Sequence, residues 1–146
     1  MAKFNYKLQP ILNLKKQMEE SVKNELGKAI QALEDEKKVL EELNKENNRC
    51  MTEVSAGVLG GLTIDKLRNY NAYISFIKQK IINQSEKVNV AQQNVDKHRE
   101  KLVAIVKERK MLETLKEKKY AEYLREQQKQ ELKFVDEIIS YKQSAK

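Results

Sequence analysis

The sequence predicts an all-α protein in which two long helices form an antiparallel coiled-coil hairpin, the second helix being longer and ending in a C-terminal overhang. Charged residues make up 35% of the 146 residues, while there are only four glycines and one proline. So few turn-forming residues cannot build a domain with many turns, and such a charged composition is typical of long helices. Apolar residues also recur every seven positions through much of the chain, and glycines cluster at a single place between two periodic stretches.

The seven-residue repeat is clearest between residues 67 and 112, where it forms two interleaved ladders. The first ladder is Leu67, Ile74, Ile81, Val88, Val95 and Leu102. The second is Tyr70, Ile77, Gln84, Ala91, His98, Ile105 and Leu112. A repeat of this length keeps one seam of a helix facing a partner helix, which is typical of a left-handed coiled coil.

The first helix is expected from about residue 8 to about residue 54, with Pro10 in its first turn, where a missing N–H is tolerated. Its expected apolar seam consists of Leu8, Ile11, Met18, Val22, Leu26, Ala29, Leu33, Leu40, Leu43, Cys50 and Val54. The four-residue steps at Met18, Val22 and Leu26 predict a local stutter in the heptad. Glu36 and Asn47 are expected on the seam as polar residues that fix the register.

The turn is expected at about residues 55–63, because Gly57, Gly60 and Gly61 lie there, and the second helix at about residues 64–143. Thr63 fits the N-cap of the second helix. A connection of about eight residues is too short for parallel helices, so the arms must be antiparallel. Folding near residue 59 would leave everything after about residue 111 without a partner in the chain. The apolar residues of that overhang would then fray, self-associate or bind another protein.

Catalysis is not expected from this sequence, and no cofactor or metal is predicted. Cys50 and His98 are the only cysteine and histidine, and both fall on the seam, where packing explains them. The glycines of the turn lack the following Lys-Ser/Thr of a phosphate-binding loop, and no pair of carboxylates suggests a general acid and base. Two packed helices also offer no deep pocket.

Charge is distributed unequally between the two arms. Residues 17–53 carry ten acidic and six basic side chains, whereas residues 65–110 carry five acidic and eleven basic ones. Flanking positions of the two arms can therefore pair across the seam. This internal pairing, together with acidic residues among the lysines of residues 107–119, argues against nucleic-acid binding. No apolar run is long enough to span a membrane and no signal peptide is recognisable, so a cytoplasmic protein without direct membrane insertion is expected.

Several phrases of the sequence resemble the flagellar export protein FliJ family. The chain opens with Phe4-Asn-Tyr6-Lys-Leu8-Gln, an aromatic-x-aromatic-x-Leu-Gln/Glu phrase that begins the first helix in that family. The turn and the start of the second helix, from Gly61 to Tyr73, are also similar, as are the segments 108–118 and 136–138. The order of these phrases and the chain length extend the resemblance over nearly the whole sequence.

The resemblance implies a non-enzymatic, stalk-like component of the flagellar type III export apparatus. Such proteins insert into the hexameric export ATPase FliI, promote its assembly and activity, contact the export gate protein FlhA and handle export chaperones. That role implies a peripheral position at the cytoplasmic face of the inner membrane. The resemblance assigns the gate contact to Tyr73 and Ile77, although Lys80 and Gln84 depart from the small residue and histidine that often follow. The ring contact is expected at Leu112, Leu115, Tyr120, Tyr123 and Leu124.

Three other functions remain open from the sequence. A generic coiled-coil scaffold or homodimeric spacer would self-associate through the overhang and affect no ATPase. An injectisome-type secretion stalk protein would have a similar sequence. A basic nucleic-acid-binding hairpin would bind in a strongly salt-dependent way.

Overall fold

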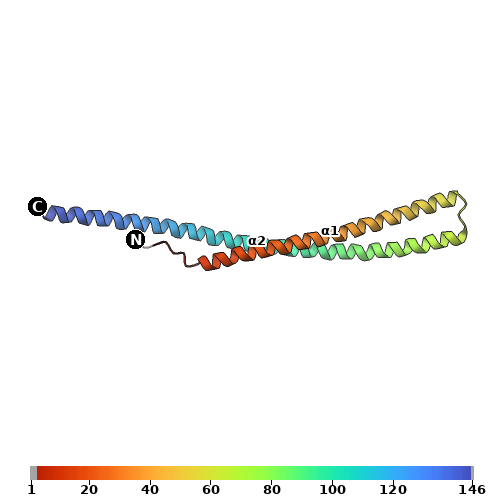
Figure 1. The fold of residues 1–146 in the computed structure, drawn as a ribbon, viewed down its shortest axis with the longest axis horizontal. Coiled ribbons are helices and arrows are strands. Elements are labelled where there is room, and N and C mark those ends of the chain that lie inside the picture. Colours follow the sequence, from red (N-terminus) through yellow and green to blue (C-terminus); the bar gives the residue numbers. More distant parts are fainter. Residues whose placement is uncertain (1–2, 146) are drawn as a thin grey trace. The chain divides into compact units, whose positions relative to one another are not determined.

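The computed structural model describes residues 3–145 and contains two helices, α1 (Gln9–Leu59) and α2 (Ile64–Ser144) (Figure 1). No strand occurs among these residues. The helices pack against each other in antiparallel directions on either side of a turn at residues 60–63, so the predicted all-α hairpin with a longer second helix is confirmed. The hairpin divides into two compact units, one of residues 21–102 and one that joins residues 1–20 to residues 103–146.

In the unit of residues 21–102, the two helices bury the predicted seam. One core cluster contains Ala29, Leu33 and Val95, and a second contains Cys50, Ile74 and Ile77. Every member of the two predicted ladders between Leu67 and Leu102 is buried or half-buried. The seven-residue repeat therefore identified the packed face of α2 correctly, because only one stripe of a helix can face a single partner.

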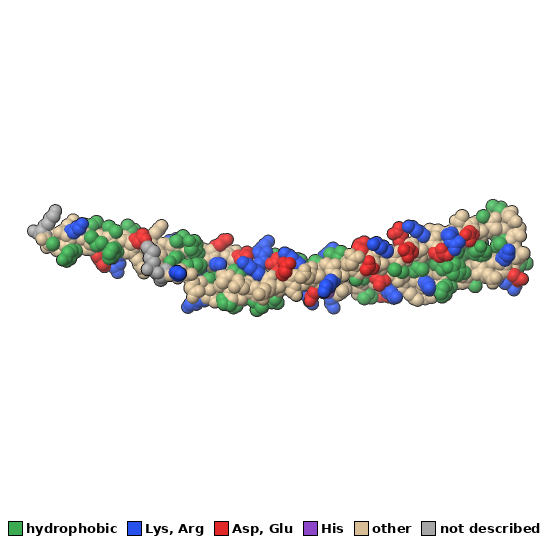
Figure 2. Space-filling view, viewed as in Figure 1, with side chains coloured by type: hydrophobic (Ala, Val, Ile, Leu, Met, Phe, Trp, Pro, Cys, Tyr) green, Lys and Arg blue, Asp and Glu red, His purple; other side chains and the backbone are tan. Residues whose placement is uncertain are grey.

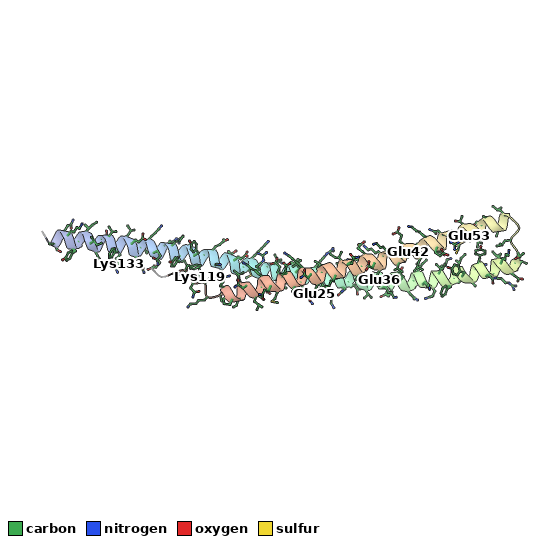
Figure 3. All side chains as sticks on the ribbon, viewed as in Figure 1. Glu25, Glu36, Glu42, Glu53, Lys119 and Lys133 are labelled. Carbon is green, nitrogen blue, oxygen red and sulfur yellow. The ribbon has the colours of Figure 1, made fainter. Side chains whose placement is uncertain are left out.

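Polar residues interrupt this seam at the expected places. Gln84 is buried, and its side-chain amide donates hydrogen bonds to the backbone carbonyl of Glu36 (2.9 Å) and to the Glu36 carboxylate. Glu36, labelled on α1 in Figure 3, is half-buried, as is Asn47. Both residues lie on the seam as predicted, and the Gln84–Glu36 pair gives this layer a specific partner that an apolar residue would not provide.

The turn is shorter than the sequence suggested. Residues 55–59 were expected in the turn but continue α1, which ends at Leu59 rather than near Val54. Gly61 has a φ of 85°, and the Leu62 N–H donates to the Gly57 carbonyl (2.7 Å), which is the Schellman arrangement at a helix end. The Leu62 side chain also packs over Gly57, where an added Cβ would lie 3.3 Å from it. Gly57 therefore serves this packing inside the helix, while only Gly61 requires the left-handed conformation.

The start of α2 has the predicted cap. The Thr63 hydroxyl accepts a hydrogen bond from the backbone N–H of Lys66 (3.4 Å), and the Thr63 carbonyl accepts one from the Leu67 N–H (3.0 Å). Asp65 lies in the first turn, where the free N–H groups favour a negative charge.

In the unit of residues 1–20 and 103–146, the expected seam of α1 is wrong at Ile11 and Met18, although Leu8 lies on it. Ile11 (45% exposed) and Met18 (39% exposed) face outward, whereas Leu12 and Glu19 are buried against α2. The heptad continues from Leu12 through Lys15 and Glu19, so α1 has no stutter. Met18 was predicted on the seam because it is apolar. Glu19 takes that position instead, because Arg109 of α2 lies opposite and pairs with it.

The Glu19–Arg109 pair explains why a carboxylate occupies a seam position. The Arg109 Nε donates to the Glu19 carboxylate, and its Nη1 donates to Glu113 on the same helix (3.0 Å). Hydrogen bonding to Glu19 is the largest cause that raises the pKa of Arg109, so the guanidinium stays charged. Lys15 forms a second ion pair across the helices with Glu108 (2.6 Å). Charge pairing therefore replaces apolar packing in this layer.

Candidate partner-binding surfaces

The face assigned to the export gate lies on the first turns of α2, in the unit of residues 21–102. Tyr73 is 43% exposed and its ring stacks near Phe76, with 6.5 Å between the ring centroids. Phe76 is exposed as well and has the Lys80 ammonium 4.6 Å from its ring centroid. Ile77, by contrast, is only 2% exposed and packs with Cys50 in the seam. The accessible aromatic side chains here are therefore Tyr73 and Phe76, while Ile77 belongs to the buried seam.

Two glutamates of α1, Glu46 and Glu53, accept hydrogen bonds from tyrosines at the start of α2. The Tyr73 hydroxyl donates to Glu46 (3.2 Å), and the Tyr70 hydroxyl donates to Glu53 (3.2 Å). Arg49 binds both carboxylates from their own helix. These hydrogen bonds to carboxylates are the largest causes that raise the pKa of Tyr70 and of Tyr73. Figure 3 labels Glu53 on α1 close to the turn.

Glu46 should titrate at unusually low pH. The hydrogen bond from Arg49, and to a lesser extent the one from Tyr73, lowers the pKa of Glu46 from 4.5 to about 2. A depressed pKa in the folded state stabilises the fold above the pKa of the unfolded chain and loses that effect as the pH falls toward 2. Arg49→Gln should return the pKa of Glu46 most of the way toward 4.5, and Tyr73→Phe should return it less, as measured by NMR titration of the carboxyl carbon. Equal effects of the two variants would contradict the order of these causes.

The N-terminal segment covers part of the surface that was assigned to the ATPase ring. Phe4 packs against Tyr120 (5.2 Å between ring centroids) and Tyr123 (5.5 Å). Tyr6 is buried, and its hydroxyl donates to the backbone carbonyl of Leu112 (2.9 Å). The expectation that everything after about residue 111 lacks a partner is therefore wrong. That expectation considered only contacts between the two helices and left out the extended residues that precede α1.

A shallow groove lies beside this contact. It has a volume of about 380 Å³ and is lined on the N-terminal side by residues 4–8 and on α2 by Leu115 and Lys119. Lys119 is labelled in Figure 3. Of the five residues predicted to contact the ring, Leu112 and Tyr123 are half-buried. Leu115, Tyr120 and Leu124 remain exposed, Leu124 lying beyond the contacts of Phe4.

Beyond the contacts of Phe4, the exposed apolar surface of α2 continues from Leu124. From residue 128 to residue 145 every described side chain is exposed, and hydrophobic side chains are visible along this stretch in Figure 2. The large apolar residues that share this exposure are Leu124, Leu132, Phe134, Val135, Ile138, Ile139 and Tyr141. We call residues 124–141 the C-terminal stripe. A helix that displays so many apolar side chains to solvent marks an interaction surface.

Cys50 and His98, the side chains that could carry chemistry, both have structural surroundings. No group of three His, Cys, Asp or Glu side chains in the described part of the chain lies close enough together to hold a metal ion. Cys50 is buried and desolvation raises the pKa of its thiol. The His98 Nδ1 lies 2.7 Å from the Asn94 carbonyl, and its Nε2 lies 3.6 Å from a Glu25 oxygen. Both residues therefore have structural explanations.

Surface charge is mixed in the unit of residues 21–102. Acidic and basic side chains are interspersed over the visible face of this unit (Figure 2). Some of them form ion pairs within α1, such as Glu41–Lys45 (3.3 Å) and Glu34–Lys37 (3.9 Å). Such interspersed charges do not form the single-sign surface that phosphate backbones need. The helices that the structure describes include none with a stretch both long and apolar enough to cross a bilayer.

Sequence reasoning missed Phe4, Tyr6, Glu19 and Arg109 as contact residues. One signal was available: Leu8, Lys15, Val22 and Ala29 follow one another at seven-residue intervals, and this spacing identifies the true seam. No comparable signal showed that residues 3–8 fold back along α2, because an extended segment has no periodicity that reveals its partner.

The fold and its surfaces define an antiparallel coiled-coil hairpin with exposed apolar side chains on α2. The sequence profile of the family described as Flagellar FliJ protein matches residues 4–146. The chain therefore belongs to the flagellar FliJ protein family, which in general comprises non-enzymatic export components. This membership supports a place in the flagellar type III export apparatus.

A solved structure shows the same fold. A protein of Chlamydia trachomatis described as a proposed YscO homolog aligns with a TM-score of 0.65 and 24% sequence identity, over 93% of each chain. At this identity the likeness establishes the fold alone. A search among curated proteins found no match.

Proposed function

We propose that this protein is the stalk-like subunit of the flagellar export ATPase, which promotes assembly and activity of the FliI hexamer and links it to the export gate protein FlhA and to export chaperones. The observation that carries the proposal is the C-terminal stripe. Its apolar side chains take no part in packing the hairpin, which has its own cores elsewhere. Their exposure is explained if another protein covers them, and a ring with a central opening can surround a single helix. The role places the protein at the cytoplasmic face of the inner membrane.

The ring contact proposed here starts closer to the C-terminus than the sequence suggested. Tyr120 and Leu124 have exposed side chains, as do the apolar residues that follow, whereas the Leu112 side chain is half-buried and its carbonyl accepts a hydrogen bond from Tyr6. Leu115 and Tyr123 lie at the edge of the N-terminal contact. We therefore propose the C-terminal stripe as the main ring-binding surface, with Tyr120 and Leu115 at its margin.

The gate contact is proposed for Tyr73, with Phe76 beside it. Both rings are exposed and held by neighbours, since Tyr73 is hydrogen-bonded to Glu46 and Phe76 is contacted by Lys80. Fixed aromatic side chains lose little freedom on binding and are common anchors of protein interfaces.

The test is steady-state ATP hydrolysis by the purified export ATPase with and without this protein. Full-length protein should stimulate hydrolysis, and a chain truncated after Tyr123 should not, because it lacks the C-terminal stripe but keeps every interhelical contact described above. A chain truncated after Tyr141 is the control and should stimulate normally. Stimulation by the shorter chain would move the ring contact elsewhere, and failure of the full-length protein to stimulate or bind the ATPase would refute the proposal.

A homodimeric spacer is the second candidate, because the same exposed stripe would favour self-association. Sedimentation equilibrium distinguishes the two functions: a spacer is a dimer that becomes monomeric after truncation at Tyr123, whereas a stalk subunit is monomeric in both forms. The injectisome alternative is less well supported, since the matching family profile is the flagellar one.

A further inference from the structure

We propose that residues 3–6, here called the N-terminal strap, form a self-contact that competes with the ATPase ring for the aromatic side chains of α2. The inference rests on the proposed function. It adds a regulatory step, because the ring must displace Phe4 before it can use Tyr120 and Tyr123 fully. The contact and both partners lie in the unit of residues 1–20 and 103–146.

The geometry shows that the strap occupies a surface with the properties of a binding site. Phe4 meets Tyr120 edge-on, with an interplanar angle of 66°, and the Tyr120 and Tyr123 rings stack with 6.3 Å between their centroids. The three rings therefore form one cluster at the start of the C-terminal stripe. Two of them belong to α2 and one to the strap, so a partner that extends along the stripe toward residue 120 reaches rings that Phe4 partly covers.

The strap is attached firmly at one end and weakly at the other. Tyr6 is buried and hydrogen-bonded to the Leu112 carbonyl, and its own carbonyl accepts a hydrogen bond from the Gln9 N–H (3.0 Å). Within the described part of the chain, no backbone–backbone hydrogen bond joins residues 3–5 to α2. Phe4 contacts α2 through its ring. An extended segment with few buried contacts opens at low cost, so a partner can displace Phe4 while Tyr6 stays anchored.

The cluster still offers a partner something to bind. Tyr120 is half exposed although Phe4 covers one edge of it, and the groove next to the strap leaves Leu115 accessible. A ring surface can therefore touch the cluster before the strap leaves. Such a partial contact suits an exchange of one set of contacts for another.

Removing the Phe4 ring should strengthen ring binding. An aromatic pair contributes modestly beyond its buried area, so Phe4→Ala should bind the nucleotide-loaded ATPase hexamer roughly two- to ten-fold more tightly than the unchanged protein. Ile82→Ala is the matched control, because it removes an exposed apolar side chain from the other unit, at a position outside the proposed binding surfaces, and should leave the affinity unchanged. Weaker binding by Phe4→Ala would show that the strap is part of the interface, and equal binding would show that it plays no role; either result overturns the proposal.

A covalent tether tests the same step by comparing one variant before and after linking. In the double variant Phe4→Cys/Tyr123→Cys, a short bismaleimide should link the strap to α2, while Cys50 is too buried to react. The linked protein should bind the hexamer at least several-fold more weakly than the same variant before linking. Equal or tighter binding after linking would refute competition. If neither form nor the unchanged protein binds the hexamer, the proposed function itself fails; if all bind but the tether has no effect, only the strap proposal fails.

Discussion

Replacing Val95 with Asp is expected to unfold most of the unit of residues 21–102. Val95 is completely buried between Ala29 and Leu33, with Leu26, Val88 and Ala91 around it. A carboxylate placed there would lose its hydration without gaining a partner, at a cost of roughly 3–5 kcal/mol. That is a large part of the total stability of a small domain. Far-UV circular dichroism during urea unfolding should show loss of most helical signal, or a strongly reduced midpoint.

Val90→Asp is the matched control for this prediction. Val90 lies on the same helix, five residues away, and is 56% exposed. Valine and aspartate have similar helix propensities, so this exchange should change the free energy of unfolding by no more than about 0.5 kcal/mol. If both variants unfolded at the same urea concentration, Val95 would not lie in the seam.

Arg109→Leu is expected to destabilise the unit of residues 1–20 and 103–146 strongly. Glu19 is 8% exposed, and Arg109 donates hydrogen bonds to its carboxylate across the two helices. Leucine would leave the buried carboxylate without the guanidinium, and breaking one side of such a pair costs more than the pair contributes. The melting temperature should fall by about 5 °C or more.

The double variant Glu19→Leu/Arg109→Leu separates pairing from packing. It converts the charged layer into an ordinary apolar heptad layer, which is often as stable as the ion pair or more so. We expect its melting temperature to match or exceed that of the unchanged protein. A double variant less stable than Arg109→Leu alone would mean that the two residues do not act as a pair.

The sequence predicted the second helix better than the first. Its seam could be read because the ladder of Ile74, Ile81, Val88 and Val95 contains only aliphatic residues, and one partner helix selects one stripe. In the first helix, Lys15 and Glu19 occupy seam positions, so reading by apolarity shifted the stripe to Ile11 and Met18. The sequence of the first helix alone cannot predict that Glu19 is buried, because its partner Arg109 lies ninety residues away.

The exposure of the residues predicted to bind partners also differs from one residue to the next. Tyr73 is exposed as a binding residue should be, while Ile77 belongs to the seam by its own heptad position, which the sequence already showed. The ring-binding surface was expected to start near Leu112. Phe4 and Tyr6 contact α2 at Leu112, Tyr120 and Tyr123, so the surface we propose lies nearer Leu124, and only three-dimensional contacts could reveal this covering.

The Gln84–Glu36 layer has a consequence for sliding of one helix along the other. In an all-aliphatic seam, a slip of seven residues would restore nearly every contact. Here such a slip would place Gln84 against Ala29 or Leu43 and take away the Glu36 carboxylate that accepts from its amide, at a cost of about 1.5–3 kcal/mol for a hydrogen bond to a charged group. The Gln84–Glu36 layer therefore fixes the register of the two helices. A pull or push applied to α2 within this unit is passed on to α1 instead of being lost in slippage.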